Sequence, residues 1–161
     1  MSKLWFDMEA DAFDLESVKQ KLASFFARRE EVAFAYLFGS CARERVTSLS
    51  DIDVAVFVIE KLIRESRYPY GYASHLTSEL MSALQTNRVD LVILNEAPPA
   101  LKYNIFTHGT PIFCRDRELE RQVYVNAFHH YQDTAPLRQT QHHYFVRYLR
   151  NLGAPASHGQ P

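Results

Sequence analysis

Cysteine is scarce in this sequence, with only Cys41 and Cys114 among 161 residues. Two cysteines are too few for a disulfide framework, and neither has neighbours at zinc-ligand spacing, so a reducing, cytoplasmic setting is expected. No apolar run approaches the roughly 20 residues that span a bilayer. Acids stand near the N-terminus where a secretory signal would carry bases, at Asp7, Glu9, Asp11 and Asp14. We therefore expect a soluble protein that is neither exported nor held in a membrane.

A strong charge of either sign is also absent. The 18 Lys and Arg residues nearly balance the 19 Asp and Glu residues, which leaves a net charge of −1 and no general attraction to nucleic acid. The hydrophobic fraction of 47% is ordinary for a globular protein. The length suits one domain, expected over 1–152, with its core at about 14–116, C-terminal helices at about 117–152 and a flexible tail at 153–161.

Hydrophobic periodicity predicts alternating helices and strands. Apolar residues recur at helical spacing in 14–29 and 72–84. Continuous apolar runs predict buried strands at 32–38, 52–59 and 89–94. Pro98 and Pro99 open a short predicted helix that ends near Gly109, and an edge strand is expected at 111–114. Two helices are expected in the remainder.

Carboxylates gather at the start of the second predicted strand. A Gly-Ser pair at 39–40 is followed, ten residues later, by Asp51 and Asp53 with one residue between them. Because side chains alternate along a strand, the two aspartates point to the same side. Two such charges repel unless they share a proton or a cation, and oxygen ligands favour Mg²⁺ or Mn²⁺ over zinc. Asp90, early in the third strand, would add a third carboxylate if the strands are neighbours, and three carboxylates can hold two metal ions.

The Gly-Ser pair supplies what a phosphate needs beside such a metal site. Gly39 lets the backbone come close to a phosphate, and Ser40 adds a hydroxyl and an amide. A short helix expected from Cys41 would direct its N-terminus at the anion, with Arg43 one turn into it. A two-metal site of this kind aligns an attacking hydroxyl and a leaving pyrophosphate on either side of a phosphorus.

This pattern resembles the G-S-x(10)-D-x-D signature of the minimal nucleotidyltransferases in the DNA polymerase β-like superfamily. The resemblance continues through Val89-Asp90-Leu91 and LKYNIFTHGTPIFCRD, and covers roughly residues 34–116. It implies an α+β nucleotidyltransferase fold in which a small mixed β-sheet is flanked by helices. The sequence departs from the family at Glu44-Arg45, where many members have a glycine.

The resemblance also implies roles for the candidate residues. Asp51 and Asp53 match metal ligands, and Asp90 matches the residue that completes the metal site and helps to deprotonate an acceptor hydroxyl. Gly39 and Ser40 match the phosphate-binding pair. Mg²⁺ is the implied cofactor and ATP the implied substrate.

Many small members of this family are antitoxins paired with a HEPN-domain toxin, a helical ribonuclease. They are similar to enzymes that silence the toxin by transferring AMP from ATP to one of its tyrosines. The resemblance therefore implies a protein adenylyltransferase with a HEPN partner. The alternatives are a non-catalytic antitoxin that acts by steric binding, and a transferase for a small molecule such as an aminoglycoside or for an RNA end. Homodimerisation stays open.

The C-terminal region carries aromatic residues at helical spacing, among them Tyr144 and Phe145. These helices would be a sensible docking surface for a partner, but such a stripe is more often part of a core, and the sequence leaves the choice open. Arg138 and His143 match the R-x(4)-H pattern of HEPN ribonucleases, but the helical region is too short for that whole domain, so we interpret the match as chance. From Thr134 onward there are three arginines and no acids, a local positive patch that could contact RNA or an acidic partner. Three such charges are more often simply part of a solvated helix.

Overall fold

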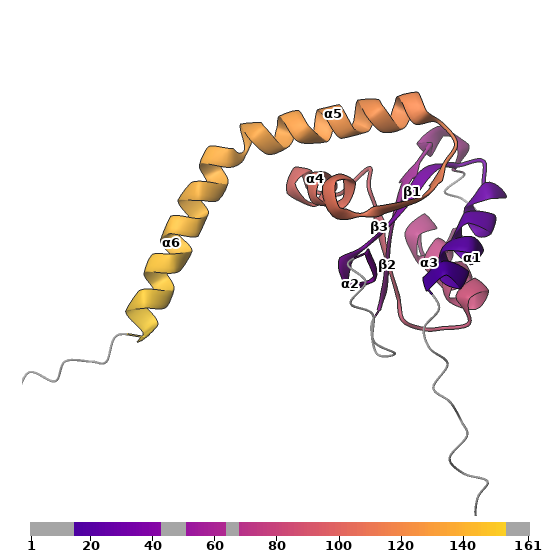
Figure 1. The fold of residues 1–161 in the computed structure, drawn as a ribbon, viewed down its shortest axis with the longest axis horizontal. Coiled ribbons are helices and arrows are strands. Elements are labelled where there is room, and N and C mark those ends of the chain that lie inside the picture. The colour runs from indigo at the N-terminus through magenta and orange to yellow at the C-terminus, as the bar shows by residue number, and fades with distance from the viewer. Residues whose placement is uncertain (1–14, 43–50, 64–67, 154–161) are drawn as a thin grey trace, which may run out of the picture.

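The computed structural model describes residues 15–42, 51–63 and 68–153. In chain order the elements are α1 (Leu15–Ala27), β1 (Val32–Phe38), α2 (Gly39–Ala42), β2 (Ile52–Val58), the 3-10 turn η1 (Glu60–Leu62), α3 (Tyr72–Leu84), β3 (Val89–Ile93), α4 (Pro99–His108), β4 (Thr110–Cys114), α5 (Arg117–Asp133) and α6 (Ala135–Gly153) (Figure 1). Residues 154–161 of the expected tail lie outside this range. None of the described helices combines the length and hydropathy needed to cross a bilayer.

Four strands form one mixed sheet in the order β3-β2-β1-β4. The central strand β1 runs antiparallel to both β2 and β4, whereas β2 and β3 run parallel. A parallel pair needs a crossover connection, and α3 provides it here. The expected α+β fold with a small mixed sheet is confirmed, and β4 is the edge strand that the sequence predicted.

Helices cover both faces of the sheet. On one face, Leu22 and Phe26 of α1 and Leu76 and Leu80 of α3 are fully buried against the strands. On the other face, Ile105 of α4 packs with the inward side chains of β1, and α5 lies beside α4. The strong hydrophobicity of β1 follows from this arrangement, because a strand covered on both faces has no solvent-facing side.

The alternation of side chains decides which face carries the polar residues of β2 and β3. Ile52 and Val54 of β2 and Val89 of β3 pack in the cluster beneath α1 and α3. Asp53 and Asp90 are the alternate residues, so they belong to the face covered by α4 and α5. The catalytic candidates therefore lie on the same side of the sheet as the C-terminal helices.

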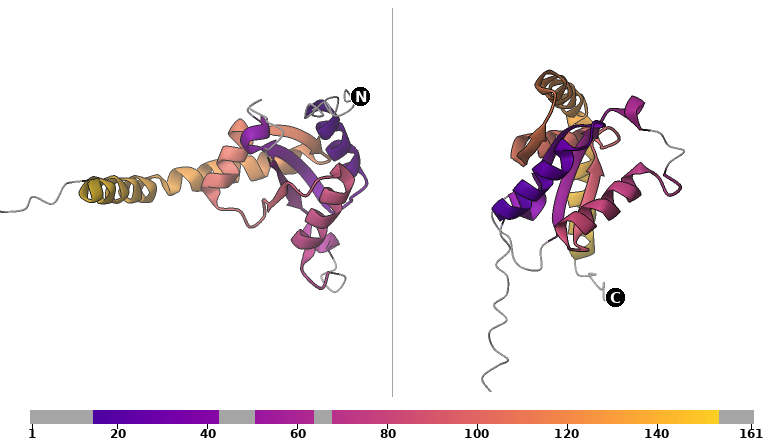
Figure 2. Two further views of the ribbon diagram at one scale, coloured as in Figure 1. Left: turned by 90° about the horizontal axis from the view of Figure 1, so that it is seen from below. Right: turned by 90° about the vertical axis from the view of Figure 1, so that its right-hand side faces the viewer.

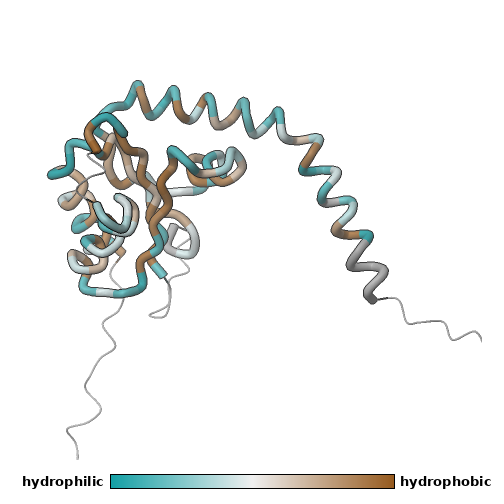
Figure 3. The backbone as a smooth tube through the Cα atoms, turned by 180° about the vertical axis from the view of Figure 1, so that it is seen from behind, coloured by the Kyte–Doolittle hydropathy of each residue, from teal (hydrophilic) through white to brown (hydrophobic). Residues whose placement is uncertain are grey.

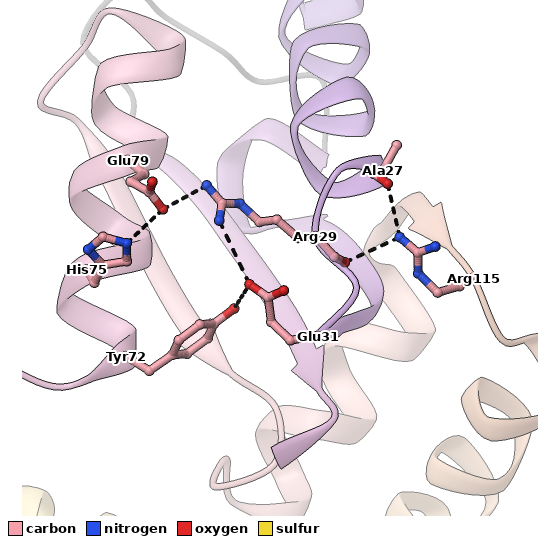
Figure 4. A network of polar contacts seen from close by, with 7 residues as sticks. All are labelled: Ala27, Arg29, Glu31, Tyr72, His75, Glu79 and Arg115. Carbon is pink, nitrogen blue, oxygen red and sulfur yellow. Dashed lines mark hydrogen bonds and ion pairs between the residues drawn. The ribbon is translucent and has the colours of Figure 1, made fainter. Parts of the chain in front are cut away.

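A polar network joins the turn after α1 to α3 and β4 (Figure 4). Arg29 donates a hydrogen bond of 2.7 Å to Glu79, and the Tyr72 hydroxyl donates one of 3.0 Å to Glu31. Arg115, just after β4, donates to the carbonyl of Ala27 at 3.0 Å. Burial, and then the nearby Glu31 carboxylate, raise the pKa of Tyr72, so its hydroxyl stays a donor. The network fixes α1 and α3 at the end of the sheet opposite the aspartates.

Helix α5 is anchored to the sheet by a buried carboxylate. Asp116 caps the helix by accepting a 2.9 Å hydrogen bond from the Leu119 amide. One turn later Glu120, which is only 8% exposed, accepts 2.7 Å and 3.1 Å hydrogen bonds from the Tyr36 hydroxyl and from Arg117. Burial and Glu120 together raise the pKa of Tyr36, which keeps that hydroxyl protonated as a donor.

Helix α6 departs from the body of the protein. Pro136 is its second residue, and a proline has no amide hydrogen to continue the hydrogen bonds of α5. Figures 1 and 2 show α6 extending away from the sheet, where no other element covers it. Between the two interpretations left open for the C-terminal aromatic residues, the core does not apply to Tyr144 and Phe145 of α6, which are 63% and 59% exposed.

Candidate active site

Three aspartates, Asp51, Asp53 and Asp90, lie at the end of the sheet where β2 and β3 begin, which we call the aspartate edge. The parallel register pairs Ile52 with Val89 and Asp53 with Asp90, so the latter two side chains lie directly beside each other on one face. Asp51 precedes β2 by one residue and is exposed, as is Asp90. The pairing of β2 with β3, which the sequence required for a third carboxylate, is thus present. Asp51 and Asp90 are accessible to solvent.

Gly39 lies directly against Asp53. Strand β1 ends at Phe38, which is paired with Asp53 across the antiparallel ladder, and Gly39 follows with φ +70°. A methyl group at residue 39 would overlap Oδ2 of Asp53 and would lie 2.8 Å from its Cγ. Only glycine satisfies both the left-handed backbone and this close approach. The Ser40 amide donates a hydrogen bond to the Asp53 carboxylate.

The site is electrostatically unfavourable for Asp53 as it stands. Partial burial raises the pKa of Asp53, and the neighbouring Asp90 and Asp51 carboxylates raise it further, against the opposing hydrogen bond from the Ser40 amide. Burial of a charge and like-charge repulsion both favour the protonated form, and a nearby cation would reverse both effects. This arrangement is the one expected of carboxylates that bind a cation.

The donor set fits Mg²⁺ or Mn²⁺. All three side chains contribute carboxylate oxygens, which are the ligands these cations prefer. Among the described residues, no group of three or more Asp, Glu, His or Cys side chains is placed so that it could hold a metal ion by itself. Mg²⁺ is commonly held by one or two carboxylates, with phosphate and water oxygens completing the shell. Asp53 and Asp90, with Asp51 beside them, match that partial cage.

Of the three phosphate-binding candidates, the structure describes Gly39 and Ser40. Helix α2 begins at Gly39 and spans four residues, so it starts two residues earlier than the helix expected from Cys41. Gly39 and Ser40 lie beside the aspartates as predicted from their spacing. Arg43 and the family departure at Glu44-Arg45 lie outside the described residues.

A small cavity adjoins the aspartate edge, and the sequence reasoning missed it. It holds about 130 Å³ between Phe38 and Gly39 on one side and Asn104 and His108 of α4 on the other. The spacing of Asn104 and His108 at i and i+4, in the last turn before Gly109, was the available signal, since it places both on one face of a helix. Hollows of about 620 Å³ and 670 Å³ lie elsewhere and include none of the three aspartates.

Comparison with known families decides the assignment. The model of the family described as polymerase beta, nucleotidyltransferase matches residues 20–118, which include every candidate residue at this edge. The chain belongs to the polymerase beta-like nucleotidyltransferase family. No curated protein sequence matches it significantly.

Solved structures of similar fold come from toxin–antitoxin complexes. A chain from the crystal structure of a toxin–antitoxin with AMP-PNP is 25% identical, with a TM-score of 0.65 over 80% of this chain and 98% of that chain. A chain from the tri-AMPylated Shewanella oneidensis HEPN toxin in complex with MNT antitoxin is 24% identical, with a TM-score of 0.62 over 83% and 99% of the two chains. A chain from the MntA–HepT toxin–antitoxin structure is 23% identical, with a TM-score of 0.60. The last two likenesses demonstrate the shared nucleotidyltransferase fold.

Proposed function

We propose that this nucleotidyltransferase is the antitoxin of a HEPN toxin–antitoxin pair, and that it transfers AMP from ATP to a tyrosine hydroxyl of its partner. The observation that carries the catalytic part is the pairing of Asp53 with Asp90, with Gly39 packed directly against the Asp53 carboxylate. The solved toxin–antitoxin complexes support the choice of partner, since one contains AMP-PNP and another an AMPylated HEPN toxin.

In this proposal Asp51, Asp53 and Asp90 would hold Mg²⁺, which would neutralise the charge of the triphosphate and of the departing pyrophosphate. Asp53 is held in place because Gly39 and the Ser40 amide contact its carboxylate. The backbone at Gly39 and the hydroxyl of Ser40 would orient the phosphates. Arg43 is proposed as a further phosphate contact.

The transfer itself is a displacement at the α-phosphorus. The tyrosine oxygen forms a bond to that phosphorus while the bond to the bridging oxygen of the β-phosphate breaks, so pyrophosphate leaves and a phosphodiester remains. Asp90, which is exposed at the edge of the site, receives the hydroxyl proton. Holding both reactants at this edge converts a bimolecular reaction into an effectively intramolecular one.

The test is the intact mass of the cognate HEPN protein after incubation with this chain, ATP and Mg²⁺. We expect mass gains in whole AMP steps, and we expect the Asp51→Ala, Asp53→Ala double variant to bind the partner without modifying it. Glu96→Ala is a matched control, because it removes an exposed carboxylate at the opposite end of the sheet, beside the hollow lined by Glu60 and Tyr68. Tight binding without any mass gain from the wild-type protein would instead support a steric antitoxin.

A further inference from the structure

Exposed apolar side chains concentrate on the C-terminal helices. Of the nine large hydrophobic residues that are exposed in the described part of the chain, seven lie on α5 and α6. The most exposed of the seven are Leu137, Tyr144 and Phe145 of α6, at 58%, 63% and 59%. Scattered apolar residues are normal on a surface, but a cluster on one element marks a site of interaction.

These three residues share one face of α6, which we call the arm face. At 100° per residue, Tyr144 lies 20° from Leu137 around the helix axis and Phe145 lies 80° from it on the other side. Val146 lies on the opposite side, 180° from Leu137. Figure 3 shows α6 as a separate rod with apolar positions along it, far from the strands. The arm face therefore has the pattern of a helix that seats in a groove of another protein.

The arm is fixed in direction by its junction with α5. Arg138 donates a 2.6 Å hydrogen bond to the Tyr131 carbonyl and contacts Thr134, while its guanidinium lies 3.6 Å from the centre of the Tyr131 ring. Tyr131 in turn stacks on Tyr103 of α4 at 4.3 Å. Arg138 thus fixes the junction to the body of the protein. These contacts give Arg138 a structural role that is independent of the R-x(4)-H pattern. A pre-ordered arm loses less entropy on binding than a free one.

Charge indicates what covers the arm face. Helix α6, from Ala135 to Gly153, contains three arginines and neither Asp nor Glu. Two copies of this helix would bring like charges together, which disfavours pairing of the arm with a second copy of itself. An apolar groove rimmed by acids would bury the aromatic residues and attract the exposed Arg147.

We propose that the arm face is the docking surface for a helical partner protein whose apolar groove is rimmed by acidic residues. Resting on the proposed function, this partner is the HEPN protein that receives AMP. Figure 1 shows α6 turning from α5 towards the side of the body on which α2 lies, beside the aspartate edge. A partner bound on the arm face would therefore have to span the distance between α6 and the strands to bring its tyrosine to the carboxylates.

The experiment compares two variants of the full chain in titration calorimetry with the cognate HEPN protein. Tyr144→Ala, Phe145→Ala removes two exposed aromatic anchors, and Val146→Ala is the control on the opposite side of the same helix. Alanine is a good helix former, so circular dichroism should be unchanged. We expect the double variant to raise Kd at least about 30-fold and the control less than about threefold. If α6 loses helicity in the double variant, Kd is measured for the single Leu137→Ala variant instead.

Four outcomes separate this inference from the proposed function. At saturating HEPN protein, the arm variant should reach the wild-type rate of AMP transfer with a raised KM, because its carboxylates are intact. Unchanged Kd and KM in the arm variant would overturn the docking surface and leave the transfer reaction standing. Weakened binding in the arm variant, together with no AMP transfer by the wild type, would uphold the docking surface and overturn the reaction. Gel filtration that shows a wild-type dimer and a monomeric arm variant would reassign the face to self-association.

Discussion

Replacing Gly39 by alanine tests the geometry of the site at one atom. The new methyl group would lie 2.8 Å from Cγ of Asp53, at least about 0.6 Å short of ordinary contact at 3.4 Å, and would overlap Oδ2. Asp53 must therefore move by roughly 1 Å, a displacement that can cost about 100-fold in rate. The φ of +70° adds about 1–2 kcal/mol of backbone strain for a residue with a Cβ. At this chain length that strain lowers Tm by about 3–6 °C.

The assay is the initial rate of AMP transfer to the HEPN protein, measured with thermal unfolding on the same samples. Gly71→Ala is the matched control, because Gly71 also has a positive φ, +85°, but nothing lies within 4 Å of a methyl group there. It should lose comparable or greater stability and keep at least half of the wild-type rate. An active Gly39→Ala variant, or equal losses of rate in the two variants, would refute the claim that Gly39 is needed for the position of Asp53.

Three further predictions follow from buried or charged groups. Asp53→Asn should abolish transfer yet raise Tm at pH 7 without metal, because a raised folded-state pKa destabilises the ionised form. The gain should vanish below about pH 4, and Mg²⁺ with ATP should stabilise only the wild type. Glu120→Ala should lower the free energy of unfolding, measured by chemical denaturation, by about 2–3 kcal/mol because it leaves the Tyr36 hydroxyl without an acceptor. The double variant with Tyr36→Phe should lose less than the sum of the two single losses, and strict additivity would contradict the coupling. Leu80→Ala in the fully buried core should cost about 2–5 kcal/mol by the same measurement, and a loss below 1 kcal/mol would contradict its placement.

Much of the fold could be predicted from hydrophobic periodicity. The helix over 72–84 and the strand over 32–38 coincide with α3 and β1, because each has a single apolar pattern bounded by turn residues. Strand order could not be derived that way. The parallel pairing of β2 with β3 depends on how α3 crosses the sheet, and the family resemblance was the source of the expected mixed sheet.

The candidate site, too, could be predicted from the sequence only in part. Alternation placed Asp51 and Asp53 on one side, but only the register brings Asp90 beside Asp53. The contact between Gly39 and Asp53 is a tertiary feature with no sequence signal beyond the glycine itself. The exposure of Tyr144 was missed because periodicity reports that a helix has an apolar face, not whether the chain provides anything to cover it.

The central claim is nucleotidyl transfer to a protein partner, and the most direct measurement follows the label from ATP carrying ³²P at the α- or the γ-phosphorus. The account predicts that the cognate HEPN protein acquires label from α-labelled ATP only, with one pyrophosphate released per AMP bound, and that the Asp53→Ala variant transfers neither. Label from γ-labelled ATP on the HEPN protein, or no label from either source while the two proteins bind, would contradict it.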